Sequence, residues 1–226
     1  MGLIATLGLI TAFFIFLFLP KVEQERSLTL KEEINVFLSP PTLLTLLITA
    51  LGCGGLFSWL SYIEPLMIDH AHLSKSQMPT VMVVAGIGMV IGNFFGGFLT
   101  DKLKPIYAGF ILFISMISVL LLVFLFSDNQ PMAWGLTFIC GIMAMSLGAP
   151  LNIIMFRAAP HAQMMGAAFM QAAFNLANTL GAYLGGKPLV WGYTTNYPAL
   201  VGAMMASVGF VCCLYMYRKY TSLFEK

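Results

Sequence analysis

Seven long apolar stretches alternate with short polar ones along the chain. Each approaches the roughly 20 residues that an α-helix needs to cross the hydrocarbon core of a bilayer. Because a helix satisfies its own backbone hydrogen bonds in lipid, the pattern predicts an all-α membrane protein with seven transmembrane helices. The predicted spans cover residues 2–20, 41–63, 79–100, 105–126, 132–156, 164–186 and 197–217.

The polar segment 21–40 has a pattern of its own. Thr29-Leu30-Lys31-Glu32 fits a capping box, and Leu30, Ile34, Phe37 and Leu38 then fall on one helical face. We expect a short amphipathic helix on the membrane surface, ended by Pro40-Pro41. A disordered tether is the open alternative, since so short a helix is marginal in isolation.

Composition excludes a soluble domain. Hydrophobic residues make up 59% of the chain, charged residues only 9%, and the mean hydropathy is +0.89, whereas a soluble domain carries about 25% charged residues. A net charge of +2 without a basic run argues against nucleic acid as a partner. The four cysteines lie in apolar stretches without a Cys/His cluster, so we expect no cofactor and no metal site.

The basic residues predict the orientation. Of the 11 Lys and Arg residues, only Lys75 and Lys187 fall on one side of the predicted topology. Because Lys and Arg concentrate in cytoplasmic loops, the other side should be cytoplasmic, with the C-terminus inside and the N-terminus outside. That side carries Lys21, Arg26, Lys31, Lys102, Lys104, Arg157, Arg218, Lys219 and Lys226.

Three amides follow one face of the sixth predicted span. Gln171, Asn175 and Asn178 have the spacing i, i+4 and i+7. An amide facing lipid would go unpaired at a cost of several kcal/mol, so these three must face protein or water. They are either hydrogen-bonding contacts between helices or the wall of a hydrated substrate cavity.

Other polar residues extend the set of cavity candidates. Asn152 follows a kink predicted at Gly148-Ala149-Pro150, and Trp59 and Tyr62 lie near the outer end of the second span, where aromatic anchoring in the membrane interface is the simpler explanation. Glu64 beside them is a possible proton-linked group, although an acid at the edge of a span is more often simply solvated.

Glycines and one turn characterise the third span. Gly88, Gly92 and Gly96 repeat every four residues, which favours close helix packing, and we interpret Asn93 beside them as an interhelical contact. The span ends in a tight turn carrying Gly97, Leu99, Asp101 and Lys102.

That turn resembles the signature turn of the major facilitator superfamily in its second-half copy, except that Lys104 and Pro105 stand where the family expects a Gly and a basic residue. The stretches FSWLSYIEPLM (57–67), GIGMVIGN (86–93), LGAPLNIIM (147–155) and MGAAFMQAAFNLANTLGAYLGG (165–186) are similar to those of arabinose-efflux permease-like members of the drug:H+ antiporter branch.

The resemblance implies that the seven spans are helices six to twelve of a twelve-helix transporter. Residues 1–20 would then belong to the N-terminal half, 21–40 to a cytoplasmic link, 41–218 to a six-helix C-terminal bundle and 219–226 to a cytoplasmic tail. The amide stripe would face the substrate pathway between the two halves.

The implied function is part of a secondary active transporter in the bacterial inner membrane. It would export a sugar or drug-like small molecule by alternating access, coupled to H+, and this chain would be a truncated or split piece that needs the missing N-terminal half. No paired carboxylates or metal-spaced histidines argue for an enzyme. A structural or receptor-like seven-helix membrane protein is the alternative.

Overall fold

The computed structural model describes residues 2–18, 36–160 and 162–224. Within these ranges every regular element is a helix and no strand occurs. The elements are α1 (Gly2–Phe18), α3 (Pro40–Leu47), η1 (Ile48–Cys53), α4 (Gly54–Ser61), α5 (Ile63–Pro65), η2 (Leu66–His70), η3 (Lys75–Gln77), α6 (Met78–Lys102), α7 (Pro105–Phe126), α8 (Gln130–Ser146), α9 (Gly148–Ala158), α10 (Gln163–Val190), α11 (Tyr197–Lys219) and η4 (Thr221–Leu223).

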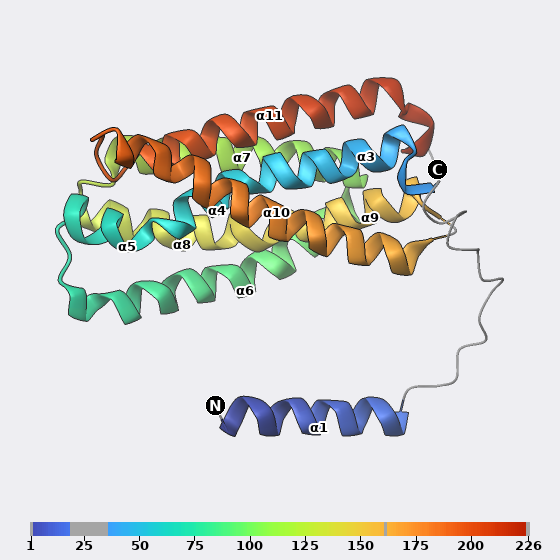
Figure 1. Ribbon diagram of the computed structural model, residues 1–226, viewed down its shortest axis with the longest axis horizontal. Coiled ribbons are helices and arrows are strands. Elements are labelled where there is room, and N and C mark those ends of the chain that lie inside the picture. The colour runs from blue at the N-terminus through green and yellow to red at the C-terminus, as the bar shows by residue number, and fades with distance from the viewer. Residues whose placement is uncertain (1, 19–35, 161, 225–226) are drawn as a thin grey trace.

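The elements from α3 to α11 form one elongated bundle whose long helices run side by side (Figure 1). The continuous stretch from α3 through η1 to α4 packs between α10 and α11, while α6 packs on α8 and α7 packs on α11. One end of the bundle holds the turn at 101–104 and residues 159–160, together with the C-terminal segment as far as Phe224. The other end holds the segments 66–77, 127–129 and 191–196 (Figure 1).

Among the residues that the structure describes, five helical stretches are long and apolar enough to cross a membrane: Pro40–Ser61, Lys75–Lys102, Pro105–Phe126, Gln130–Ala158 and Tyr197–Lys219. The protein is therefore a multi-pass membrane protein, and these five match predicted spans to within a few residues. The predicted count of seven is not confirmed. Helix α10 has 28 residues, but its amides and small residues make it less apolar, and α1 has only 17 residues.

The glycine stripe packs as predicted. A methyl group added at Gly88, Gly92 or Gly96 would collide with the main-chain carbonyls of Phe138, Ile142 and Ser146, respectively. Helices α6 and α8 are thus in backbone contact, which only residues without a side chain allow. The predicted kink is also present, because α8 ends at Ser146 and α9 begins at Gly148.

Polar side chains other than the three stripe amides connect the segments of the bundle. Ser58 Oγ on α4 donates to the carbonyl of Pro198 at 2.7 Å, and Asn196 Nδ2 donates to the carbonyl of Phe124 at 2.8 Å. Ser146 Oγ on α8 lies 3.0 Å from the carbonyl oxygen of Gly92. Such bonds contribute roughly 0.6 kcal/mol each in a membrane bundle.

The predicted link helix lies mostly outside the described residues. Of its predicted apolar face, Phe37 is buried and its ring centroid lies 4.5 Å from that of Phe169, whereas Leu38 is exposed. At the other terminus, η4 follows α11, and Phe224 is buried. The segment predicted as a tail therefore packs onto the bundle as far as Phe224.

Candidate functional site

The amide stripe of α10 lies on the surface of the bundle. Gln171, Asn175 and Asn178 are all exposed. None of their side chains forms a hydrogen bond with another described residue. Apart from the main-chain bonds of the helix, the three residues make one hydrogen bond: the main-chain carbonyl of Asn175 accepts from Thr179 Oγ1 at 3.0 Å. Within the described part of the chain, these amides therefore form no hydrogen bonds between helices of the bundle.

The sequence of α10 explains this placement. Its buried residues recur every three or four positions and are mostly Gly and Ala: Gly166, Met170, Ala173, Ala177, Gly181, Gly185 and Pro188. This face packs against α4 and η1, and a methyl group at Gly185 would collide with Ser58 Oγ. Gln171 and Asn178 each follow a buried residue directly, so the stripe lies about 100° around the helix from the packed face.

A small apolar hollow lies beside the packed face. Its volume is about 20 Å³, and Phe57, Leu60, Met145 and Phe174 are among the residues that line it. It has room for about one water molecule but offers that water few polar partners. Phe174 directly precedes Asn175, so aromatic and amide groups adjoin at this edge of α10.

Tyr62 lies beyond the C-terminal end of the stripe. It is half-buried, and its hydroxyl donates to the main-chain carbonyl of Ala182 at 2.9 Å. Ala182 lies four residues after Asn178, on the same face of α10. The structure thus brings this predicted candidate next to the amides.

The other two candidates lie elsewhere. Asn152 on α9 is half-buried, and its Nδ2 donates to the carbonyl of Gly148 at 2.8 Å. Its amide therefore bonds within its own helix, in the first turn after the kink. Trp59 is only 1% exposed, and its Nε1 has no hydrogen-bond partner among the described residues. Trp59 therefore belongs to the bundle core and reaches no surface.

The charged candidates lie at opposite ends of the bundle. Glu64 is exposed on α5, close to the segment 66–77. In the signature-like turn, Gly97 and Leu99 are partly buried, whereas Asp101 and Lys102 are exposed.

The departure of this turn from the family pattern has a structural reason. Helix α6 ends at Lys102, and Pro105 takes the first position of α7. Proline is well suited to that position because its missing N–H would have no helical partner there. The connection between α6 and α7 is therefore two residues long, 103 and 104.

Two further features differ from the sequence interpretation. Asn93 is exposed, and its side chain bonds no other described residue, so it is not the interhelical contact we expected. The ammonium of Lys187 lies 4.4 Å from the ring centroid of Tyr183. Their i, i+4 spacing is a pattern that sequence reasoning could have used and did not.

Comparison with known proteins identifies the family. The family model described as Major Facilitator Superfamily matches residues 1–186. The chain belongs to the major facilitator superfamily. The Escherichia coli (strain K12) proteins "Putative transporter AraJ" and "Inner membrane transport protein YdhP" are both 30% identical to it, over 96% and 95% of this chain and 55% of each relative. A "Probable sugar efflux transporter" of Haemophilus influenzae (strain PittGG) is 28% identical over 99% of this chain and 56% of that protein.

Two statements follow from these similarities. The relatives are named as transporters, which points to a transporter rather than an enzyme. The chain spans about half the length of the curated relatives it matches.

Proposed function

We propose that this chain is the C-terminal bundle of a secondary active transporter, and that the amide stripe of α10 forms one wall of the substrate pathway. The observation that carries the proposal is the exposure of Gln171, Asn175 and Asn178 without side-chain partners among the described residues. Three amides facing hydrocarbon would each lose several kcal/mol of hydrogen bonding. A hydrated space shared with a second bundle removes that loss.

The proposed substrate is a neutral sugar or drug-like molecule, exported from the cell. Amides supply both donors and acceptors and carry no charge, and Phe174 and Tyr62 beside them offer apolar contact. A sugar substrate is also consistent with the name of the Haemophilus relative. Transport requires a partner bundle, because alternating access rocks one bundle against another around the site.

The proposed location is the bacterial inner membrane, with the C-terminus in the cytoplasm. Of the described basic residues, Lys102, Lys104, Arg157, Arg218 and Lys219 lie at one end of the bundle, whereas Lys75 and Lys187 belong to the other half. That asymmetry supports a cytoplasmic position for the end with the turn at 101–104. Glu64 at the opposite end is the remaining candidate for a proton-linked group.

Cysteine accessibility tests the pathway. Single cysteines at 171, 175 and 178 in the assembled transporter should react with a membrane-impermeant thiol reagent. A cysteine at Leu176, which is exposed on another face of α10, should not. If the three stripe positions reacted only with a lipid-soluble reagent, the amides would face hydrocarbon and the proposal would be wrong.

A further inference from the structure

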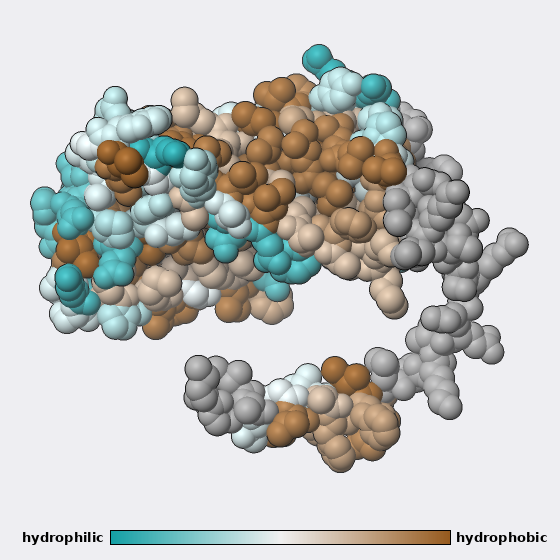
Figure 2. Space-filling model, in the orientation of Figure 1, coloured by the Kyte–Doolittle hydropathy of each residue, from teal (hydrophilic) through white to brown (hydrophobic). Residues whose placement is uncertain are grey.

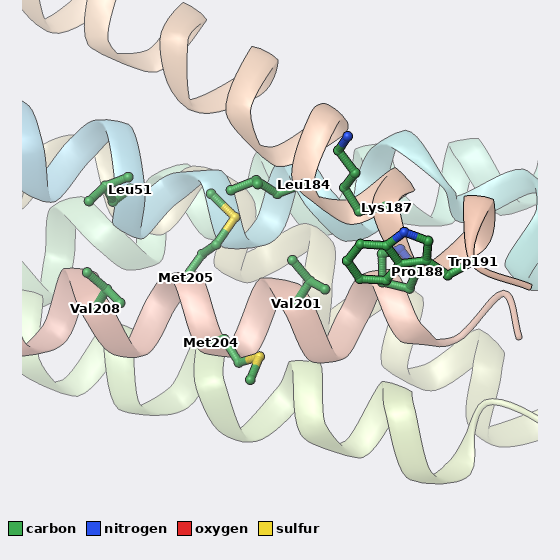
Figure 3. Close-up of a pocket in the computed structure, with 9 residues that line it drawn as sticks. All are labelled: Leu51, Leu184, Lys187, Pro188, Trp191, Val201, Met204, Met205 and Val208. Carbon is green, nitrogen blue, oxygen red and sulfur yellow. The ribbon is translucent and has the colours of Figure 1, made fainter. Parts of the chain in front are cut away.

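A second, apolar groove opens between α10, α11 and η1. Its volume is about 410 Å³. Figure 3 shows Val201, Met204, Met205 and Val208 on α11, with Leu51 at the end of the groove opposite Trp191. Nearly all of its lining is hydrocarbon or thioether, so water has almost no hydrogen-bond partner there.

The length of the groove matches part of one membrane leaflet. Val201 and Val208 are seven residues apart on α11, which corresponds to about 10 Å along the helix axis. The hydrocarbon of one leaflet is about 15 Å thick, half of the roughly 30 Å core. An acyl chain lying beside α11 would therefore contact the groove over most of its depth in that leaflet.

The outer rim of the groove is cationic and amphipathic. Lys187 and Trp191 both come from the end of α10, and Figure 3 shows them at the same end of the groove, with the ammonium of Lys187 pointing away from α11. Trp191 is 70% exposed, and the Lys187 ammonium lies 4.4 Å from the centroid of the Tyr183 ring. Tryptophan and lysine at the end of a membrane helix are the side chains that meet lipid headgroups.

We propose that an anionic phospholipid occupies this groove. One acyl chain lies along Val201 and Val208, and the phosphate lies beside Lys187. Charge complementarity selects an anionic headgroup, because the apolar groove itself accepts any acyl chain and Lys187 is the only charged side chain among the described residues that line it. Attraction to one such cation is expected to favour an anionic over a zwitterionic lipid about fivefold, equivalent to about 1 kcal/mol.

This lipid site is separate from the amide stripe. At 100° per residue, Lys187 lies about 180° around α10 from Asn178, about 120° from Asn175 and about 160° from Gln171. The groove therefore opens on the opposite side of the helix from the proposed substrate pathway. The inference does not depend on the proposed function.

Trp191 fluorescence provides the test. The chain is reconstituted into zwitterionic vesicles containing a minor fraction of a phospholipid with brominated acyl chains, which quench tryptophan on contact. Subtracting the signal of Trp191→Phe isolates Trp191 from the two other tryptophans. We expect brominated phosphatidylglycerol to half-quench Trp191 at about one fifth of the mole fraction that brominated phosphatidylcholine requires.

Substitutions at the rim test whether Lys187 causes the preference for the anionic lipid. Lys187→Gln should abolish the preference and Lys187→Arg should keep it. Lys75→Gln, at the other described lysine of this end of the bundle, should also leave it unchanged. Equal quenching by both lipids, a preference that survives in Lys187→Gln, or a Trp191 that neither lipid quenches because protein covers the groove would each overturn the proposal.

Discussion

At the residue scale, what a side chain does here depends on its neighbours more than on its type. Asn196 and Ser58 are buried and bond carbonyls of other segments, whereas Asn175 and Asn178 are exposed without side-chain partners among the described residues. The same contrast holds for glycine. A methyl group at Gly92 would collide with the carbonyl of Ile142, whereas one at Gly86 on the same helix would meet nothing within 4 Å.

This contrast predicts the effect of two alanine substitutions. Gly92→Ala should destabilise the protein by about 1–3 kcal/mol, because α6 and α8 must move apart to admit the methyl group. Gly86→Ala is the matched control and should leave stability unchanged or slightly raised. Thermal unfolding of the purified protein in detergent measures both, and equal midpoints for the two variants would contradict the backbone contact.

At the element scale, α10 has three differently used faces. Small residues pack it against α4, the amides lie about 100° away, and the α10 residues that line the apolar groove adjoin the packed face on the side away from the amides. Such a helix is less apolar than its neighbours, although it is the longest element described. Polar residues on a membrane helix are typical of a pathway that the helix shares with a partner.

Replacing one amide tests this division. Asn175→Leu should lower transport by the assembled transporter about two- to tenfold, the equivalent of one lost hydrogen bond of about 0.5–1.5 kcal/mol. Membrane insertion should stay normal, because no described residue of this bundle bonds that side chain. Leu176→Ala is the control for a neighbouring position on another face. Parallel losses of insertion and transport in Asn175→Leu would instead indicate a structural role.

At the scale of the whole molecule, the bundle is asymmetric in both charge and surface. Figure 2 shows brown, apolar side chains over one half of the visible bundle surface and more hydrophilic ones toward the other. Basic residues concentrate at the end where α6 meets α7 and where α11 finishes. Because Lys and Arg concentrate in cytoplasmic loops, we propose that this end lies in the cytoplasm.

Reporter fusions test the orientation. Green fluorescent protein fused after Lys226 should fluoresce, because it folds in the cytoplasm, and alkaline phosphatase at the same position should be inactive. Alkaline phosphatase inserted between Trp191 and Asn196 should be active, because that loop lies at the opposite end. The reverse pattern of activities would show that the bundle is inverted.

The sequence predicted much of the fold for a simple reason. Long apolar stretches have one low-energy state in lipid, so the five spans, the glycine packing of α6 and the break before Gly148 follow from local pattern. The candidate site was less predictable. The i, i+4, i+7 spacing put the three amides on one face, but it left open whether that face was packed. Nor did local pattern predict that Asn93 is exposed and Trp59 buried.

The sequence by itself therefore determined the solvent and the elements: a chain with so few charges must be surrounded by lipid, and in lipid it must be helical. Only the tertiary structure decided which polar side chains form hydrogen bonds inside the bundle and which are exposed on its surface. The reason is that burial is a property of pairs of helices. Ser58 and Asn175 have similar local settings, but Ser58 meets a carbonyl of a neighbouring segment while Asn175 meets none among the described residues.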